Sequence, residues 1–95
     1  MRVAALIEYT TDKDKIAAVR PTHRQYLGEL LAAGKLAISG PTLDDWGAII
    51  VYEAESVEEA EKLLQGDPFH AAGVFVRWTL RPWNPLFGNK ALLPG

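Results

Sequence analysis

The order of hydrophobic periods along the chain is the feature that most restricts its fold. Four short segments have the alternation or the β-branched and aromatic composition of a β-strand, and two segments between them have the period of an amphipathic helix. The strands are expected over residues 3–9, 36–39, 46–53 and 74–81, and the helices over 21–33 and 57–65. This βαββαβ order predicts an α+β domain in which two helices cover one face of a four-stranded antiparallel sheet.

Local signals indicate where the two helices begin and end. Pro21 suits the first position of a helix, where its missing N–H costs nothing, and Arg20 before it is biased away from helical geometry. The apolar stripe continues upstream, which allows a short helical turn before the proline. Gly34 ends this helix as a C-terminal cap would. Ser56 caps the second helix, with Glu59 three residues later completing a capping box.

The length of the chain sets its domain organisation. The 95 residues are enough for one domain and too few for two, and we expect this domain to span residues 1–83. Residues 84–95 form a tail rich in proline and glycine. The tail also carries Leu86, Phe87, Leu92 and Leu93. An apolar tail of this kind is expected to dock on the domain or on its partner.

Both faces of the predicted sheet are apolar. In the first strand Val3, Ala5 and Ile7 face one way, and Leu6 faces the other. Two helices can cover only one of these faces, so the other face needs a second cover. A second copy of the chain, packed sheet against sheet, is the simplest cover. The sequence therefore predicts a homodimer through the sheet face.

Charge and composition argue against several classes of protein. The formal net charge is -2 and no basic block exceeds two adjacent residues, so the clustered cations of a nucleic-acid-binding protein are missing. The chain has no apolar run long enough to span a membrane, and the apolar start ends at Glu8, too soon for a signal peptide. Without cysteine there is no disulfide and no thiol nucleophile. These features fit a cytoplasmic protein.

His23 is the first candidate for chemistry. On the predicted helix it lies in the first turn, on the same stripe as Tyr26 and Leu27. The positive end of a helix favours a neutral imidazole, and a neutral imidazole beside a cleft can act as a general base. The alternative is a half-buried histidine that is hydrogen-bonded to a backbone carbonyl.

Asp67 is the second candidate, and its sequence context allows two roles. An aspartate before Pro68 is well suited to capping a short turn. A carboxylate can also hold the tautomer of a histidine, and His23 is the available partner. The sequence alone cannot bring the two together. His70, on the same turn, is expected to be an exposed surface histidine.

The remaining candidates are residues of the strands. Arg77 and Arg81 share one face of the last strand, where they can bind a substrate carboxylate or flank the rim of a dimer. Tyr9 and Ser39 can line a pocket. Phosphate loops, zinc signatures and the nucleophile elbow are missing, and two histidines without cysteine make a poor metal site. No metal and no cofactor are therefore expected.

Several short motifs resemble, in order and spacing, those of the YciI-like family. They are Arg20-Pro21-Thr22-His23-Arg24-Gln25-Tyr26-Leu27, Gly34-Lys35-Leu36, Ser39-Gly40-Pro41, Ser56-Val57-Glu58-Glu59-Ala60, Asp67-Pro68-Phe69, Ala72-Gly73-Val74 and Arg81-Pro82-Trp83. The resemblance runs from the first strand to about Trp83. It implies a ferredoxin-like fold that dimerises as an α+β barrel, similar to muconolactone isomerase.

The resemblance also implies a catalytic pair. The histidine of the family's Arg-Pro-x-His pattern corresponds to His23, and the aspartate of its Asp-Pro pattern corresponds to Asp67. The implied activity is proton transfer, elimination or hydrolysis on a small organic molecule, including dehydrochlorination of aromatic-type compounds. The alternative function is a non-catalytic dimeric module that binds a small ligand or a protein. Haem binding, which occurs in some relatives of the barrel, is a third possibility.

Overall fold

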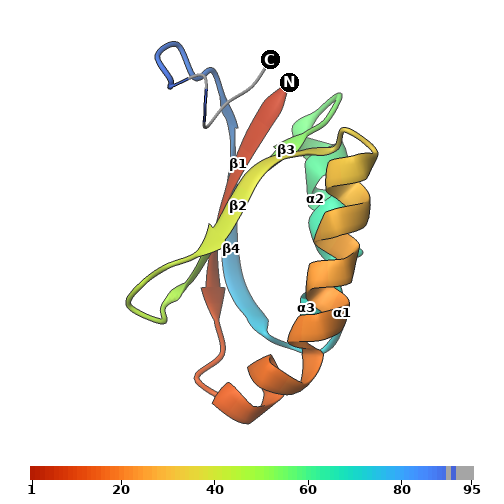
Figure 1. The fold of residues 1–95 in the computed structure, drawn as a ribbon, viewed down its shortest axis with the longest axis vertical. Helices are drawn as coiled ribbons and strands as arrows, with labels where there is room; N and C mark the ends of the chain where they lie inside the picture. The colour runs from red at the N-terminus through yellow and green to blue at the C-terminus, as the bar shows by residue number, and fades with distance from the viewer. Residues whose placement is uncertain (90, 92–95) are drawn as a thin grey trace.

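The computed structural model describes residues 1–89 and residue 91. Its elements are β1 (Arg2–Tyr9), α1 (Lys13–Ala32), β2 (Leu36–Pro41), β3 (Gly47–Glu53), α2 (Val57–Gln65), α3 (Pro68–Ala71) and β4 (Phe75–Trp83). The four strands form one sheet of order β2-β3-β1-β4, and each neighbouring pair is antiparallel. Figure 1 shows α1 and α2 on the same side of this sheet. Apart from the single-turn α3, the arrangement confirms the predicted ferredoxin-like βαββαβ fold.

The core lies between the sheet and the helices. On the central strand β1, Val3, Ala5 and Ile7 are fully buried, and the pairing with β3 places Tyr52 beside Val3 and Ile50 beside Ala5. Burying a side chain of the size of valine or isoleucine contributes about 1.5–3 kcal/mol. The helices complete this core with Ile16 and Leu30 from α1, Ala60 and Leu64 from α2, and Phe69 from α3.

The first helix begins at Lys13, so the expected start at Pro21 is wrong, and the helical turn allowed before the proline is part of the same helix. Asp12 caps the helix, and its Oδ1 accepts a hydrogen bond from the Lys15 N–H at 3.1 Å. Pro21 lies inside the helix, where a proline costs about 3 kcal/mol. The helix continues through it because Ile16 and Val19, upstream of the proline, pack against the core.

The second helix confirms its predicted capping. The Ser56 hydroxyl accepts a hydrogen bond from the Glu59 N–H at 3.1 Å. The Glu59 carboxylate accepts the Glu55 N–H at 3.2 Å, one residue before the position that the usual capping box would use. The helix ends at Gln65, directly before Gly66.

A β-bulge in the pairing of β1 with β4 reverses the expected faces at the start of β4. Glu8 pairs with Arg77 and Tyr9 pairs with Phe75, which leaves Val76 as the extra residue. As a result Phe75 is buried, whereas Val76 is 51% exposed. Simple alternation with Trp78 and Leu80, which pack against the core, would bury Val76 and expose Phe75.

The hairpin between β2 and β3 depends on a glycine. A Cβ atom on Gly47 would lie 1.8 Å from the carbonyl oxygen of Ile7 on the adjacent strand, so no other residue fits there without moving the backbone. Thr42 closes the loop, because its hydroxyl accepts the Gly47 N–H at 3.0 Å. Asp45, at the tip, has a left-handed backbone with a φ of 64°. These contacts fix the loop that borders the cavities described below.

The face of the sheet opposite the helices carries exposed apolar side chains. Leu6 and Ile49, which are neighbours across β1 and β3, are each 49% exposed. Within the described part of the chain no helix covers this face (Figure 1). In the tail, Leu86 is 76% exposed and Phe87 is 95% exposed, so neither docks on its own domain. Docking on a partner stays a prediction, and Leu92 and Leu93 lie outside the described residues.

Candidate active site

The structure brings His23 on α1 and Asp67 at the N-cap of α3 into direct contact. The two residues are 44 positions apart in the sequence, and the Nδ1 atom of His23 lies 2.8 Å from Oδ1 and 2.9 Å from Oδ2 of Asp67. His23 is 6% exposed and Asp67 is fully buried. A buried carboxylate of this kind needs such partners, since desolvation without them is expensive.

Asp67 fulfils both roles that its sequence context allows. Its Oδ1 accepts the Phe69 N–H at 2.9 Å and so caps α3, while both oxygens face the imidazole of His23. Because an ionised carboxylate can only accept hydrogen bonds, the Nδ1 atom of His23 donates. The proton therefore sits on Nδ1 in the neutral ring, and the lone pair is left on Nε2.

The plane of the imidazole is fixed by aromatic neighbours. The ring of His23 stacks on Phe69 with centroids 3.9 Å apart and an interplanar angle of 11°. Phe75 meets the same imidazole edge-on, with centroids 6.4 Å apart. Stacking and the hydrogen bond to Asp67 act on different parts of the ring, so together they leave it little freedom to rotate. This pre-organisation is what a general base requires.

His23 opens onto a cavity of about 530 Å³ between α1 and the β2–β3 hairpin. This volume lies in the range of about 300–1,000 Å³ that is usual for small-molecule sites. The lining residues are Tyr9, Arg20, His23, Arg24, Leu27, Ser39, Gly40, Pro41, Thr42, Leu43, Asp45, Ala48, Ile50 and Phe69. Since Nδ1 is turned to Asp67, Nε2 is the nitrogen that a ligand in this cavity can reach.

A second cavity, of about 410 Å³, adjoins the first. The two cavities share Tyr9, Arg20, Pro41, Thr42 and Asp45 in their linings, so they lie side by side and are together called the cleft. The cleft is bordered by α1 on one side and by the hairpin loop on the other.

Two of the strand residues that the sequence proposed as ligand-binding lie at this cleft. Tyr9 lines both cavities, and Ser39 lines the larger cavity together with His23. Burial raises the pKa of Tyr9 to about 12, the negative charge of Asp67 acts in the same direction, and Arg20 opposes them. The Tyr9 phenol therefore stays protonated at neutral pH and can donate a hydrogen bond to a ligand.

Arg77 and Arg81 lie elsewhere. Their pairing with Glu8 and Ala4 places them on the face of the sheet that is turned away from the helices, and Arg77 contacts the Glu8 carboxylate at 3.2 Å. Neither arginine lines the cleft. A role in ligand binding stays a prediction for them, and it requires a ligand on that face or at a subunit boundary.

His70 is less exposed than its sequence context suggests. It is half-buried, and its ring meets Trp78 at a centroid distance of 5.3 Å. It lines neither cavity. His70 therefore has no contact with the cleft, and its environment is that of a packed surface histidine.

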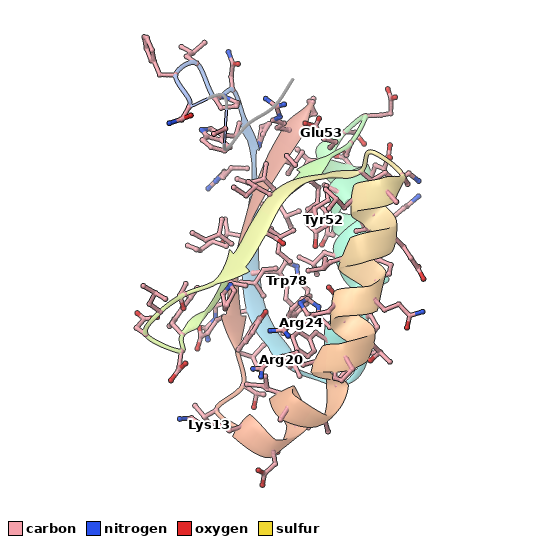
Figure 2. All side chains as sticks on the ribbon, in the orientation of Figure 1. Lys13, Arg20, Arg24, Tyr52, Glu53 and Trp78 are labelled. Atoms are coloured by element: carbon pink, nitrogen blue, oxygen red, sulfur yellow. The ribbon has the colours of Figure 1, made fainter. Side chains whose placement is uncertain are left out.

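Arg20 and Arg24, which line the larger cavity with His23, were not among the site residues predicted from the sequence. Figure 2 shows both arginine side chains on the side of α1 that faces the sheet. On one continuous helix, positions 20, 23 and 24 share a face. This signal was present in the sequence, but placing the helix start at Pro21 separated Arg20 from the other two residues.

Residues 1–89 and 91 contain no group of three or more His, Cys, Asp or Glu side chains that could hold a metal ion. Among the helices of the described chain, none is both long and apolar enough to cross a lipid bilayer.

The fold and the cleft define a ferredoxin-like α+β domain with a buried histidine–aspartate pair beside a cavity. The chain belongs to the family of the YCII-related domain, whose sequence model matches residues 1–84. It is 31% identical over 93 residues to Protein YciI of Escherichia coli O6:H1 and of Shigella flexneri, covering 83% of this chain and 95% of each relative. It is also 36% identical over 61 residues to YjpA of Bacillus subtilis, covering 64% of this chain and 71% of YjpA.

A solved enzyme structure has the same fold. The 5-chloro-2-hydroxyhydroquinone dehydrochlorinase TftG of Burkholderia phenoliruptrix AC1100, in complex with 2,5-dihydroxybenzoquinone, matches with a TM-score of 0.77 and 28% sequence identity. The match covers 88% of this chain and 94% of TftG. These relatives confirm the YciI-like resemblance, and the structural neighbour is an enzyme that acts on a small molecule.

Proposed function

We propose that this protein is an enzyme that moves a proton to or from a small organic molecule in the cleft, with Nε2 of His23 as the general base or acid. The observation that carries the proposal is the fixed imidazole, with Nδ1 held by Asp67 at 2.8 Å and the ring opening on the cavity. A positioned base of this type accelerates a reaction about 10²–10⁴-fold.

Asp67 acts through His23 in this proposal. Its carboxylate keeps the proton on Nδ1, so that the Nε2 lone pair points to the cavity, and it stabilises the imidazolium that forms when Nε2 takes a proton. The Phe69 N–H at 2.9 Å holds the carboxylate in place. Asp67 is a positioning residue, because its full burial keeps it out of contact with the ligand.

The proposed substrate is a hydroxylated six-membered ring. TftG, whose structure holds 2,5-dihydroxybenzoquinone, supports this class, and the aromatic and apolar lining by Phe69 and Leu27 suits a ring. In a dehydrochlorination, the base takes a proton, the freed electron pair forms the new double bond, and chloride leaves with the electrons of the carbon–chlorine bond. Such a step consumes no oxidant or reductant.

The uncovered sheet face supports a homodimer as part of the proposal. Leu6, Ile49 and Val76 are each about half exposed on one chain, and burial of such apolar side chains against a second copy would stabilise the pair of subunits. A dimer through this face leaves the cleft open, since the cleft lies on the helix side of the sheet.

The test is turnover of 5-chloro-2-hydroxyhydroquinone by the wild-type protein and by His23→Asn, with chloride release and loss of substrate as readouts. We expect the variant to retain the fold and to lose at least about 100-fold in rate. Equal rates for both proteins would refute the role of His23. Binding seen by native mass spectrometry, with the compound recovered unchanged, would instead support the non-catalytic binding module.

A further inference from the structure

Two arginines of the cleft, Arg20 and Arg24, have no ionic partner among the residues that the structure describes. Arg20 and Arg24 both line the larger cavity, and within residues 1–89 and 91 neither forms a salt bridge or a side-chain hydrogen bond. By contrast, Arg2 pairs with Glu53 and Arg77 pairs with Glu8. Two guanidinium groups, four residues apart on one helix, therefore line the same cavity, and neither is paired with a carboxylate of the described residues.

The carboxylates near the cleft do not neutralise these arginines. Asp67 is fully buried and held by His23 and the Phe69 N–H. Asp45, which lines both cavities, lies 3.9 Å from the Lys13 ammonium group. Since the whole chain has a formal net charge of -2, the positive charge of the cleft is a local arrangement and not a general excess of basic residues.

We propose that the cleft is selective for anionic ring compounds, with Arg20 and Arg24 binding a carboxylate or ionised hydroxyl group of the ligand. The inference rests on the proposed function, because it takes the His23 cavity as the substrate site. The ring lies against Phe69 and Leu27, and the phenol of Tyr9 donates a hydrogen bond from the strand side. Guanidinium groups suit this task because they present several donors in a fixed plane.

The spacing on α1 links this anion site to the proposed chemistry. Residues three and four apart on a helix have Cβ atoms roughly 5–6 Å apart, so Arg20, His23 and Arg24 converge on one small molecule. A proton taken by Nε2 leaves negative charge on the ring, and the same arginines are placed to stabilise that charge as it develops. The ligand's anionic group and its reacting atom are therefore on the same ring.

The experiment compares 4-hydroxybenzoate with 4-hydroxybenzamide, a pair that differs mainly in charge. Binding is followed by amide NMR spectra of the labelled protein, which also report whether each variant is folded. We expect the wild-type protein to bind the benzoate at least about tenfold more tightly than the amide, with shifts at α1 and β2. Arg20→Gln and Arg24→Gln should each remove most of this preference, and the double variant should abolish it.

Lys15→Gln is the matched control, since it removes one positive charge from the same helix at a residue that lines neither cavity. We expect it to keep the preference. The inference would be overturned if the wild-type protein bound both compounds equally well or did not bind the benzoate at about 10 mM. It would also be overturned if Arg77→Gln, rather than the two cleft variants, lost the preference. His23→Asn should keep the preference, so a failed catalytic assay with intact anion selection would refute the proposed activity and leave this inference standing.

Discussion

The contact between His23 and Asp67 predicts a large energetic coupling between the two residues. In the structure Asp67 has two donors, the His23 Nδ1 and the Phe69 N–H, and it is fully buried. His23→Ala leaves the carboxylate buried with only one of these donors, and losing a hydrogen bond to a charged group in this way costs about 1.5–3 kcal/mol.

Asp67→Ala removes the same contact and also the cap of α3. A lost N-cap costs about 0.5–2 kcal/mol, and a lost hydrogen bond to a charged group costs about 1.5–3 kcal/mol, so we expect a total of roughly 2–5 kcal/mol. The double variant has no uncompensated charge. Its cost should therefore be smaller than the sum of the two single costs by about 2 kcal/mol.

The assay is urea unfolding of the four proteins, followed by far-ultraviolet circular dichroism at one pH and one protein concentration. Domains of this size unfold with a free energy of only about 5–15 kcal/mol, so His23→Asn and Asp67→Asn provide a milder second cycle if an alanine variant does not fold. Additivity within about 0.5 kcal/mol would contradict a direct interaction between the two side chains.

Three further predictions concern the rest of the molecule. Gly47→Ala should lower the free energy of unfolding by about 3 kcal/mol or more, because the added Cβ would lie 1.8 Å from a backbone oxygen. Gly28→Ala, where a Cβ would have nothing within 4 Å, should raise the free energy of unfolding by about 0.5–1 kcal/mol. Urea unfolding curves of the two variants and the wild-type protein measure both changes. The pKa of Tyr9 is raised from 10.0 to about 12, so the contribution of the protonated phenol to stability is complete below pH 10 and is lost as the pH rises towards 12. Ultraviolet titration of the wild-type protein against Tyr9→Phe measures this pKa, and ionisation of Tyr9 near pH 10 would contradict the prediction. Leu6→Lys should shift a dimer to a monomer in sedimentation velocity, and an unchanged sedimentation coefficient would argue against the sheet-face interface.

The order of the elements could be predicted from the sequence because each strand and helix has its own hydrophobic period. The capping of α2 by Ser56 is a local signal, and the structure confirms it. The start of α1 could not be read in this way. The local preference of Pro21 points to a helix start, whereas the packing of Ile16 and Val19, which depends on the assembled core, extends the helix to Lys13.

The same limit applies to the site. His23 and Asp67 could be named as candidates from their motifs, but their contact depends on the docking of α1 against α3, which no local pattern specifies. Arg77 and Arg81 looked suitable because they share a strand face, and only the register of β4 against β1 shows that this face is turned away from the cleft. Arg20 and Arg24 were missed because the error at the helix start concealed the face that they share with His23.

Proton transfer by His23 can be measured directly as exchange of the ring protons of 2,5-dihydroxybenzoquinone with deuterium from heavy water, followed by NMR at neutral pH. We expect the wild-type protein to accelerate this exchange over the uncatalysed rate and Lys15→Gln to do so equally well. The rate with His23→Asn should fall to within about tenfold of the uncatalysed rate, since the positioned base accounts for about 10²–10⁴. Exchange by His23→Asn at the wild-type rate would refute the role of His23, because the proton would then move without the imidazole.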